Sequence, residues 1–235
     1  MPLRKIALTA FVILHSFASF ANDENSPYYS DAGSWNTFNV SYGFNKRFSL
    51  LFTQEFRLKE NYTRLNLFYT NLGVEYKISK KLKTSLVYRL TDKFLDDNTF
   101  SFRHRFMWDA TVKIPYKKFS FSYRHRLQVE YKNLYSSETG SIPEWYSRSK
   151  FEIAFKATKK ISPYFSAEFR YQICDIKAEE SQGTWHRTRY QLGIDYQYSE
   201  RSKFGIYYLI QNEYNVSIPE NQYITGLEYS LSLGK

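Results

Sequence analysis

The side chains best able to do chemistry in this sequence are arginines that alternate with large apolar residues. Residues 100–106 read FSFRHRF, and residues 119–127 read FSFSYRHRL. A guanidinium group is always charged, and its planar fork of donors matches carboxylate and phosphate groups. Arginines gathered on one surface would therefore bind or conduct anions.

The spacing in these two segments is that of a strand. Apolar residues recur every second position rather than at the three-and-four spacing of a helix, so the rings share one face and the arginines share the other. His104 and His125 fall in phase with the rings. They have no third ligand at metal spacing, so we expect them to be polar spacers and expect neither a metal site nor a cofactor.

The first 21 residues have the layout of a secretory signal peptide. A basic start and an apolar run over residues 6–20 precede the small-x-small site SFA at residues 19–21. This run is shorter than the roughly 20 apolar residues of a spanning helix. We therefore expect residues 1–21 to be removed on export and residues 22–235 to form a single domain.

Composition and charge point to a membrane barrel. The chain has 22 Tyr and 20 Phe, yet its mean hydropathy is −0.55. A barrel reconciles the two, because its lipid-facing residues are apolar while its lumen and loops are polar. The net charge of +10 would also suit a nucleic-acid partner, but export and the wide spread of the arginines argue against one.

Eleven segments alternate strongly enough to predict strands. They cover residues 35–44, 47–58, 64–77, 82–93, 99–114, 117–132, 145–157, 163–174, 184–198, 202–214 and 221–232. Short connections alternate with longer ones, as in outer-membrane barrels with short periplasmic turns and longer outer loops. Because bacterial single-chain barrels have even strand numbers, we expect twelve antiparallel strands, with residues 26–33 supplying the extra one, or else ten.

The arginines must face the lumen, because an arginine facing lipid at mid-membrane costs about 2–4 kcal/mol. Those at lumen phase are Arg57, Arg89, Arg103, Arg105, Arg124, Arg126, Arg148, Arg170, Arg187 and Arg189. Acidic residues at the same phase are Glu55, Glu75, Asp109, Glu130, Glu152, Glu168, Asp195, Glu213 and Glu228. We expect a belt of arginines near the outer mouth, with these carboxylates as partners.

The turn of the 99–132 hairpin predicts which arginines meet. Residues whose numbers sum to about 231 should face each other, which places Arg105 opposite Arg126, with Arg103 and Arg124 diagonal to them. Four like charges repel unless anions lie between them. This pairing predicts an anion-binding cluster.

Three functions fit these features. The first is a narrow pore for small anionic solutes, because arginine-lined pores favour anions. The second is a non-conducting barrel whose lumen is plugged by arginine and glutamate, with a structural, adhesion or envelope-maintenance role. Similar hairpin pairing puts Arg187 near Glu213 and Lys150 near Glu168, which favours partial plugging.

The third and least favoured function is a membrane-embedded lipid hydrolase. Such an enzyme needs Ser, His and a carboxylate or amide within mutual reach. His186 and Ser181 lie near the outer rim, but no motif connects them. We therefore expect no enzymatic activity.

Several stretches resemble a known family. GSWNTFNVSY, FYTNLGVEYKISKKLK, SFRHRFMWD, SRSKFEIAFK, ISPYFSAEFRYQ, GTWHRTRYQLGIDY and YYLIQNEYNV are similar to an uncharacterised β-barrel family, widespread in Bacteroidetes and named only as a domain of unknown function. The resemblance implies a bacterial outer-membrane location and no catalytic residues. In size and inward arginines the chain more loosely resembles the twelve-stranded porins for acidic oligosaccharides, a likeness of fold alone.

The C-terminal stretch ITGLEYSL, residues 224–231, resembles the closing-strand signal that the barrel-assembly machinery reads. It differs from that signal because the chain continues through Leu-Gly-Lys instead of ending on Phe. The expected partners are outer-membrane lipid and lipopolysaccharide, the assembly machinery during biogenesis, and a small anionic solute.

Overall fold

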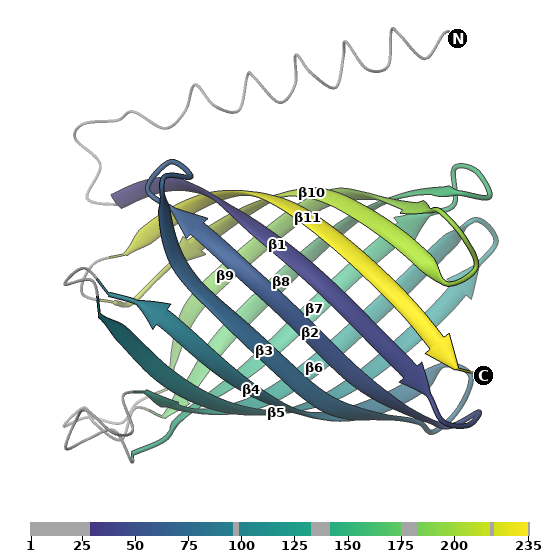
Figure 1. Ribbon diagram of the computed structural model, residues 1–235, viewed down its shortest axis with the longest axis horizontal. Helices are drawn as coiled ribbons and strands as arrows, with labels where there is room; N and C mark the ends of the chain where they lie inside the picture. Colours follow the sequence, from purple (N-terminus) through teal and green to yellow (C-terminus); the bar gives the residue numbers. More distant parts are fainter. Residues whose placement is uncertain (1–28, 96–98, 133–141, 175–182, 217–218, 235) are drawn as a thin grey trace, which may run out of the picture.

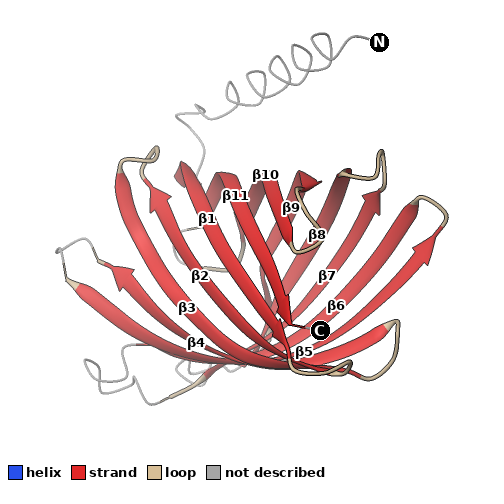
Figure 2. Ribbon diagram, turned by 45° about the vertical axis from the view of Figure 1, so that its right-hand side comes forward, coloured by secondary structure: helices blue, strands red, loops and turns tan. Residues whose placement is uncertain are grey.

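The computed structural model describes residues 29–95, 99–132, 142–174, 183–216 and 219–234. These residues form one closed barrel of eleven strands (Figure 1), and the strands are joined by loops and turns (Figure 2). The strands are β1 (Tyr29–Gly43), β2 (Phe48–Lys59), β3 (Arg64–Lys77), β4 (Leu82–Phe94), β5 (Phe100–Tyr116), β6 (Phe119–Lys132), β7 (Glu144–Phe155), β8 (Ile161–Cys174), β9 (Thr184–Gln197), β10 (Ser202–Glu213) and β11 (Glu220–Gly234). Within the described ranges no helix is long and apolar enough to cross a membrane. The predicted signal peptide, residues 1–21, lies outside these ranges.

The barrel closes through one parallel pair. Every other neighbouring pair is antiparallel, whereas β1 runs parallel to β11 from Tyr29↔Glu220 to Gly43↔Gly234. A parallel ladder also pairs the backbone N–H and C=O groups of the two strands. An odd number of strands can therefore close without leaving an edge.

The predicted count of twelve strands, or ten, is wrong for the described residues. The segment 26–33 does not supply a separate strand, because from Tyr29 onward it is the beginning of β1. The even-number rule assumes antiparallel closure, and the parallel seam removes that requirement.

The two ends of the barrel differ in their connections. Short turns lie at the end where β11 finishes, and they cover residues 44–47, 78–81, 117–118, 156–160 and 198–201. At the opposite end, where β1 begins (Figure 1), three connections are longer than any of these turns, namely residues 133–143, 175–183 and 214–219. We call these the short-turn end and the long-loop end.

The outer surface of the barrel is apolar. Leu72, Leu86 and Leu192 are 57%, 63% and 64% exposed, although each lies in the middle of a strand. His104 accompanies the outward rings and bonds to the hydroxyl of Tyr88 at 2.7 Å. The inner surface is polar instead, with buried glutamine, glutamate and arginine side chains. The described strands thus place polar side chains inside the barrel and apolar side chains outside, the alternation typical of transmembrane barrels.

The register of the β5–β6 hairpin corrects the sequence prediction. Arg105 pairs with Glu130, and Arg126 pairs with Asp109. The predicted pair of Arg105 and Arg126 is therefore wrong, and so is the cluster of four like charges built on it. The turn centre lies between Lys117 and Lys118 instead of between Pro115 and Tyr116, which shifts the register by four residues. An even shift leaves every side chain on its predicted face.

Lys117 explains this position of the turn. Its φ is 52°, in the left-handed region that tight two-residue hairpin turns require. Pro115 sits near the end of β5, where a strand tolerates a residue without an N–H donor. The other two predicted neighbours agree with the structure, because Glu213 pairs with Arg187 and Lys150 with Glu168.

Candidate anion site in the barrel lumen

The lumen holds two adjoining cavities of about 990 Å³ and 420 Å³. All ten predicted lumen arginines line the larger cavity. Of the predicted acidic residues, Glu75 and Asp109 line the smaller cavity. The other acidic residues at lumen phase all line the larger one, namely Glu55, Glu130, Glu152, Glu168, Asp195, Glu213 and Glu228.

The larger cavity carries an excess of positive charge. Sixteen Lys and Arg side chains and ten Asp and Glu side chains line it, an excess of six. The smaller cavity adds Glu75 and Asp109 but no further cation, so the excess over both is four. In a confined space with low-dielectric walls, such an excess concentrates anions.

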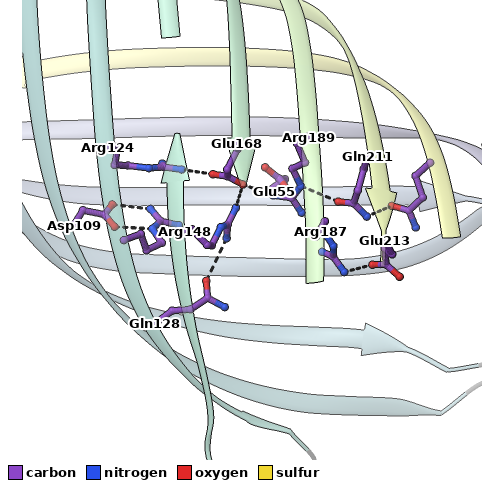
Figure 3. Close-up of polar contacts among 12 residues, drawn as sticks. Glu55, Asp109, Arg124, Gln128, Arg148, Glu168, Arg187, Arg189, Gln211 and Glu213 are labelled. Atoms are coloured by element: carbon purple, nitrogen blue, oxygen red, sulfur yellow. Dashed lines mark hydrogen bonds and ion pairs between the residues drawn. The ribbon is translucent and has the colours of Figure 1, made fainter. Parts of the chain in front are cut away.

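Glu168 on β8 is the centre of the densest ion-pair cluster. Its carboxylate accepts hydrogen bonds from Arg124 at 2.6 Å, from Arg189 at 3.2 Å and from Arg148. Arg148 also donates to Gln128, and Figure 3 shows its guanidinium reaching both partners. One carboxylate thus holds side chains from β6, β7 and β9.

Asp109 completes this cluster on β5. It accepts two parallel hydrogen bonds from Arg126, at 2.6 and 2.7 Å (Figure 3). Bidentate, charge-assisted pairs of this kind are among the strongest hydrogen bonds in proteins. We call Asp109, Arg124, Arg126, Arg148, Glu168 and Arg189 the paired cluster.

Most other predicted carboxylates also meet a cation. The further ion pairs are Glu55–Arg57, Glu75–Lys83, Glu130–Arg105, Glu152–Lys150, Asp195–Lys203 and Glu213–Arg187. Glu228 differs, because its carboxylate accepts a hydrogen bond from the hydroxyl of Ser230 at 2.9 Å and has no cation within ion-pair distance among the described residues. The lumen is therefore largely neutralised from within.

Aromatic rings form a second set of arginine partners. Two guanidinium groups lie over the ring of Trp35 on β1, with Arg57 at 3.6 Å and Arg189 at 4.9 Å from the ring centroid. Because Arg189 comes from β9, this contact reaches past two intervening strands. Trp35 packs in turn against Leu209 and Ile224.

Three of the ten lumen arginines lack a carboxylate within ion-pair distance among the described residues. Arg89 lies 3.4 Å above the ring centroid of Tyr69, and Arg170 lies 3.6 Å above that of Tyr146. The Nε atoms of Arg103 and Arg170 are buried without a hydrogen-bond partner, as are those of four carboxylate-paired lumen arginines, whereas Arg89 donates its Nε–H to Asn71 at 2.7 Å. We call Arg89, Arg103 and Arg170 the unpaired arginines. They have donor capacity that an incoming anion could use.

Sequence reasoning did not single out the rings that support these arginines. Trp35, Tyr69 and Tyr146 lie at lumen phase, so the available signal was an aromatic residue on the otherwise polar face. Of the hydrolase pair, His186 packs edge-on against Tyr146, while Ser181 lies outside the described residues.

The fold and the lumen define a closed β-barrel with an apolar exterior and an arginine-rich, polar interior. Residues 32–223 match the family described as a protein of unknown function (DUF2490). The chain belongs to this family, as the resemblance in sequence predicted. No curated protein matches the chain.

Proposed function

We propose that the protein spans the bacterial outer membrane and forms a narrow passage for small anionic solutes. Residues 1–21 act as the export signal in this proposal. The strands have 12 to 17 residues, which exceeds the 9–11 that a tilted membrane strand needs. The exposed leucines and rings of the outer face supply the lipid-facing surface.

The observation that carries the proposal is the larger lumen cavity with its excess of cations. Barrels of eight strands are filled by side chains, and open aqueous channels are typical of sixteen or more. Eleven strands fall between these limits, and the cavity of about 990 Å³ gives room for a small hydrated anion. The unpaired arginines would be the groups that such an anion meets.

Conductance in planar bilayers tests the proposal. The refolded protein should conduct, and its reversal potential in a salt gradient should show anion selectivity. Replacing two unpaired arginines, in Arg103→Gln with Arg170→Gln, should move that potential toward zero. As a matched control, Asp109→Asn with Arg126→Gln removes an ion pair without changing the net charge, and it should leave the potential unchanged. If the protein shows no conductance at any voltage, the proposed passage is wrong.

The alternative is a closed barrel with a structural or adhesion role. The feature that favours it is the contact of Arg189 with Trp35, which joins β9 to β1 inside the lumen. A silent wild-type protein that conducts after Trp35→Ala would identify this contact as the plug. An intact-lipid turnover assay with His186→Ala separates both proposals from the hydrolase.

A further inference from the structure

The short-turn end repeats one turn design. In four of its five turns a side-chain oxygen accepts hydrogen bonds from the backbone N–H groups two and three residues ahead, at 2.8–3.3 Å. The accepting residues are Asn45, Ser79, Thr158 and Ser199. Such Asx and Ser/Thr turns fix the backbone locally. The two residues after each acceptor are left at the tip of the turn.

Those two tip residues are almost always cationic. They are Lys46-Arg47, Lys80-Lys81, Lys159-Lys160 and Glu200-Arg201, and the fifth turn contributes Lys117-Lys118. The set holds nine cations and one acid, all of them exposed. We call these ten residues the basic rim.

The backbone holds the basic rim in a ring. The carbonyl of Arg47 accepts a hydrogen bond from Lys77, and that of Lys81 from Lys113, each at 2.8 Å. The remaining turns make the equivalent bond to the next hairpin, through the carbonyls of Lys118, Lys160 and Arg201. Each turn is thus tied to its neighbour, and the cations surround the barrel instead of gathering on one side.

A belt of aromatic side chains adjoins the basic rim. Phe44, Phe48, Tyr116 and Tyr198 flank the turns and are 55%, 45%, 59% and 65% exposed. Aromatic belts of this kind lie at the level of lipid headgroups. If the belt lies there, the cations just beyond it are level with the phosphates.

We propose that the basic rim binds the phosphate groups of anionic phospholipids in the leaflet at the short-turn end. This rests on the proposed membrane location but not on conduction. A leaflet contacts all five turns at once, whereas a protein docking from one side would contact only one or two of them. The short turns also reach little beyond the aromatic belt, which favours headgroups over a more distant cell-wall polymer.

Spin-labelled lipids test this in vesicles that contain the refolded barrel. The measured quantity is the association constant of labelled phosphatidylglycerol relative to that of labelled phosphatidylcholine. We expect a preference of up to about five-fold at low salt, the contribution of one cation near an anionic surface. The preference should fall at high salt, because screening weakens exposed charges.

Four substitutions separate charge from structure. Lys80→Gln, Lys81→Gln, Lys159→Gln and Lys160→Gln together keep Ser79 and Thr158, so the turns are retained, and they should lower the preference by about half. The same four positions changed to Arg should keep it, and Glu200→Lys should raise it.

A relative association constant of one, or one that the Gln variant does not change, would overturn the proposal. Co-sedimentation with peptidoglycan that needs the same lysines, without a lipid preference, would assign the basic rim to the cell wall instead. If the protein does not insert into any vesicle, both the proposed membrane location and the proposed binding of phospholipid by the basic rim are wrong. If the protein inserts and prefers anionic lipid but does not conduct, only the proposed passage for anions is wrong.

Discussion

The paired cluster and the unpaired arginines are built from the same residue type on the same face of the barrel, yet their charges differ in availability. Arg148 on β7 and Arg170 on β8 are directly opposite each other in register and are 7% and 8% exposed. Arg148 donates to Glu168, while Arg170 lies on the ring of Tyr146. Because the two arginines are equally buried and face each other in register, they differ mainly in the group that each one contacts.

The difference teaches that an inward arginine is not by itself a site for an anion. A guanidinium that shares a carboxylate has its charge matched by that partner, whereas one resting on a ring has no counter-charge in ion-pair contact. The ring stabilises the cation through its negative face without neutralising its charge. On this basis we expect the paired cluster to stabilise the wall of the barrel, and the proposed passage assigns the contact with a solute to the unpaired arginines.

The largest expected effect comes from removing the centre of the paired cluster. Glu168→Gln leaves three guanidinium groups without their shared counter-charge. Breaking a buried ion pair from one side costs about 3–5 kcal/mol, and the adjoining cavity favours the low end of this range. Urea unfolding of the refolded barrel, followed by tryptophan fluorescence, should show a loss of about 3 kcal/mol.

Glu228→Gln is the matched control for Glu168→Gln. It removes the same charge from the same cavity, but its carboxylate contacts Ser230 rather than arginine. We expect its unfolding free energy to stay within about 0.5 kcal/mol of the wild type. Equal losses in the two variants would show that net charge, and not the cluster, stabilises the barrel.

A smaller effect should follow from weakening the bidentate pair. Asp109→Asn keeps one oxygen that can accept from Arg126 but removes the charge and the second acceptor. A hydrogen bond to a charged group contributes about 1.5–3 kcal/mol, so we expect a loss of about 2 kcal/mol in the same urea assay. The charge-reversed pair Asp109→Arg with Arg126→Asp should recover part of this loss, and no recovery would contradict a direct interaction between them.

The sequence predicted the faces of the strands because alternation has a period of two and a membrane would penalise any outward arginine. It did not predict the register of the β5–β6 hairpin, since that depends on the left-handed backbone of Lys117. Nor did it predict the parallel seam of β1 and β11, because strand pairing across the ends of a chain leaves no local signal.

The partners of the arginines were predictable only within a hairpin. Arg187 and Glu213 lie on adjacent strands and follow from register. Arg189 and Trp35 lie on β9 and β1, and their contact depends on how the whole barrel closes. Which arginines remain unpaired is therefore a property of the closed barrel and not of any one segment.

Apart from the control at Glu228, the smallest effect on stability should come from an unpaired arginine, and it gives the sharpest test of the difference between the two groups. Arg170→Gln loses a stacking contact of about 1–2 kcal/mol but also relieves the desolvation of a buried charge, so we expect a net change below about 1 kcal/mol. Arg148→Gln is the same substitution at the facing position, and it should cost more because Glu168 loses a partner. If the two variants unfold at the same urea concentration, the contacting group does not determine how much each arginine contributes to stability. Arg170 would then be no more available to an anion than the arginines of the paired cluster.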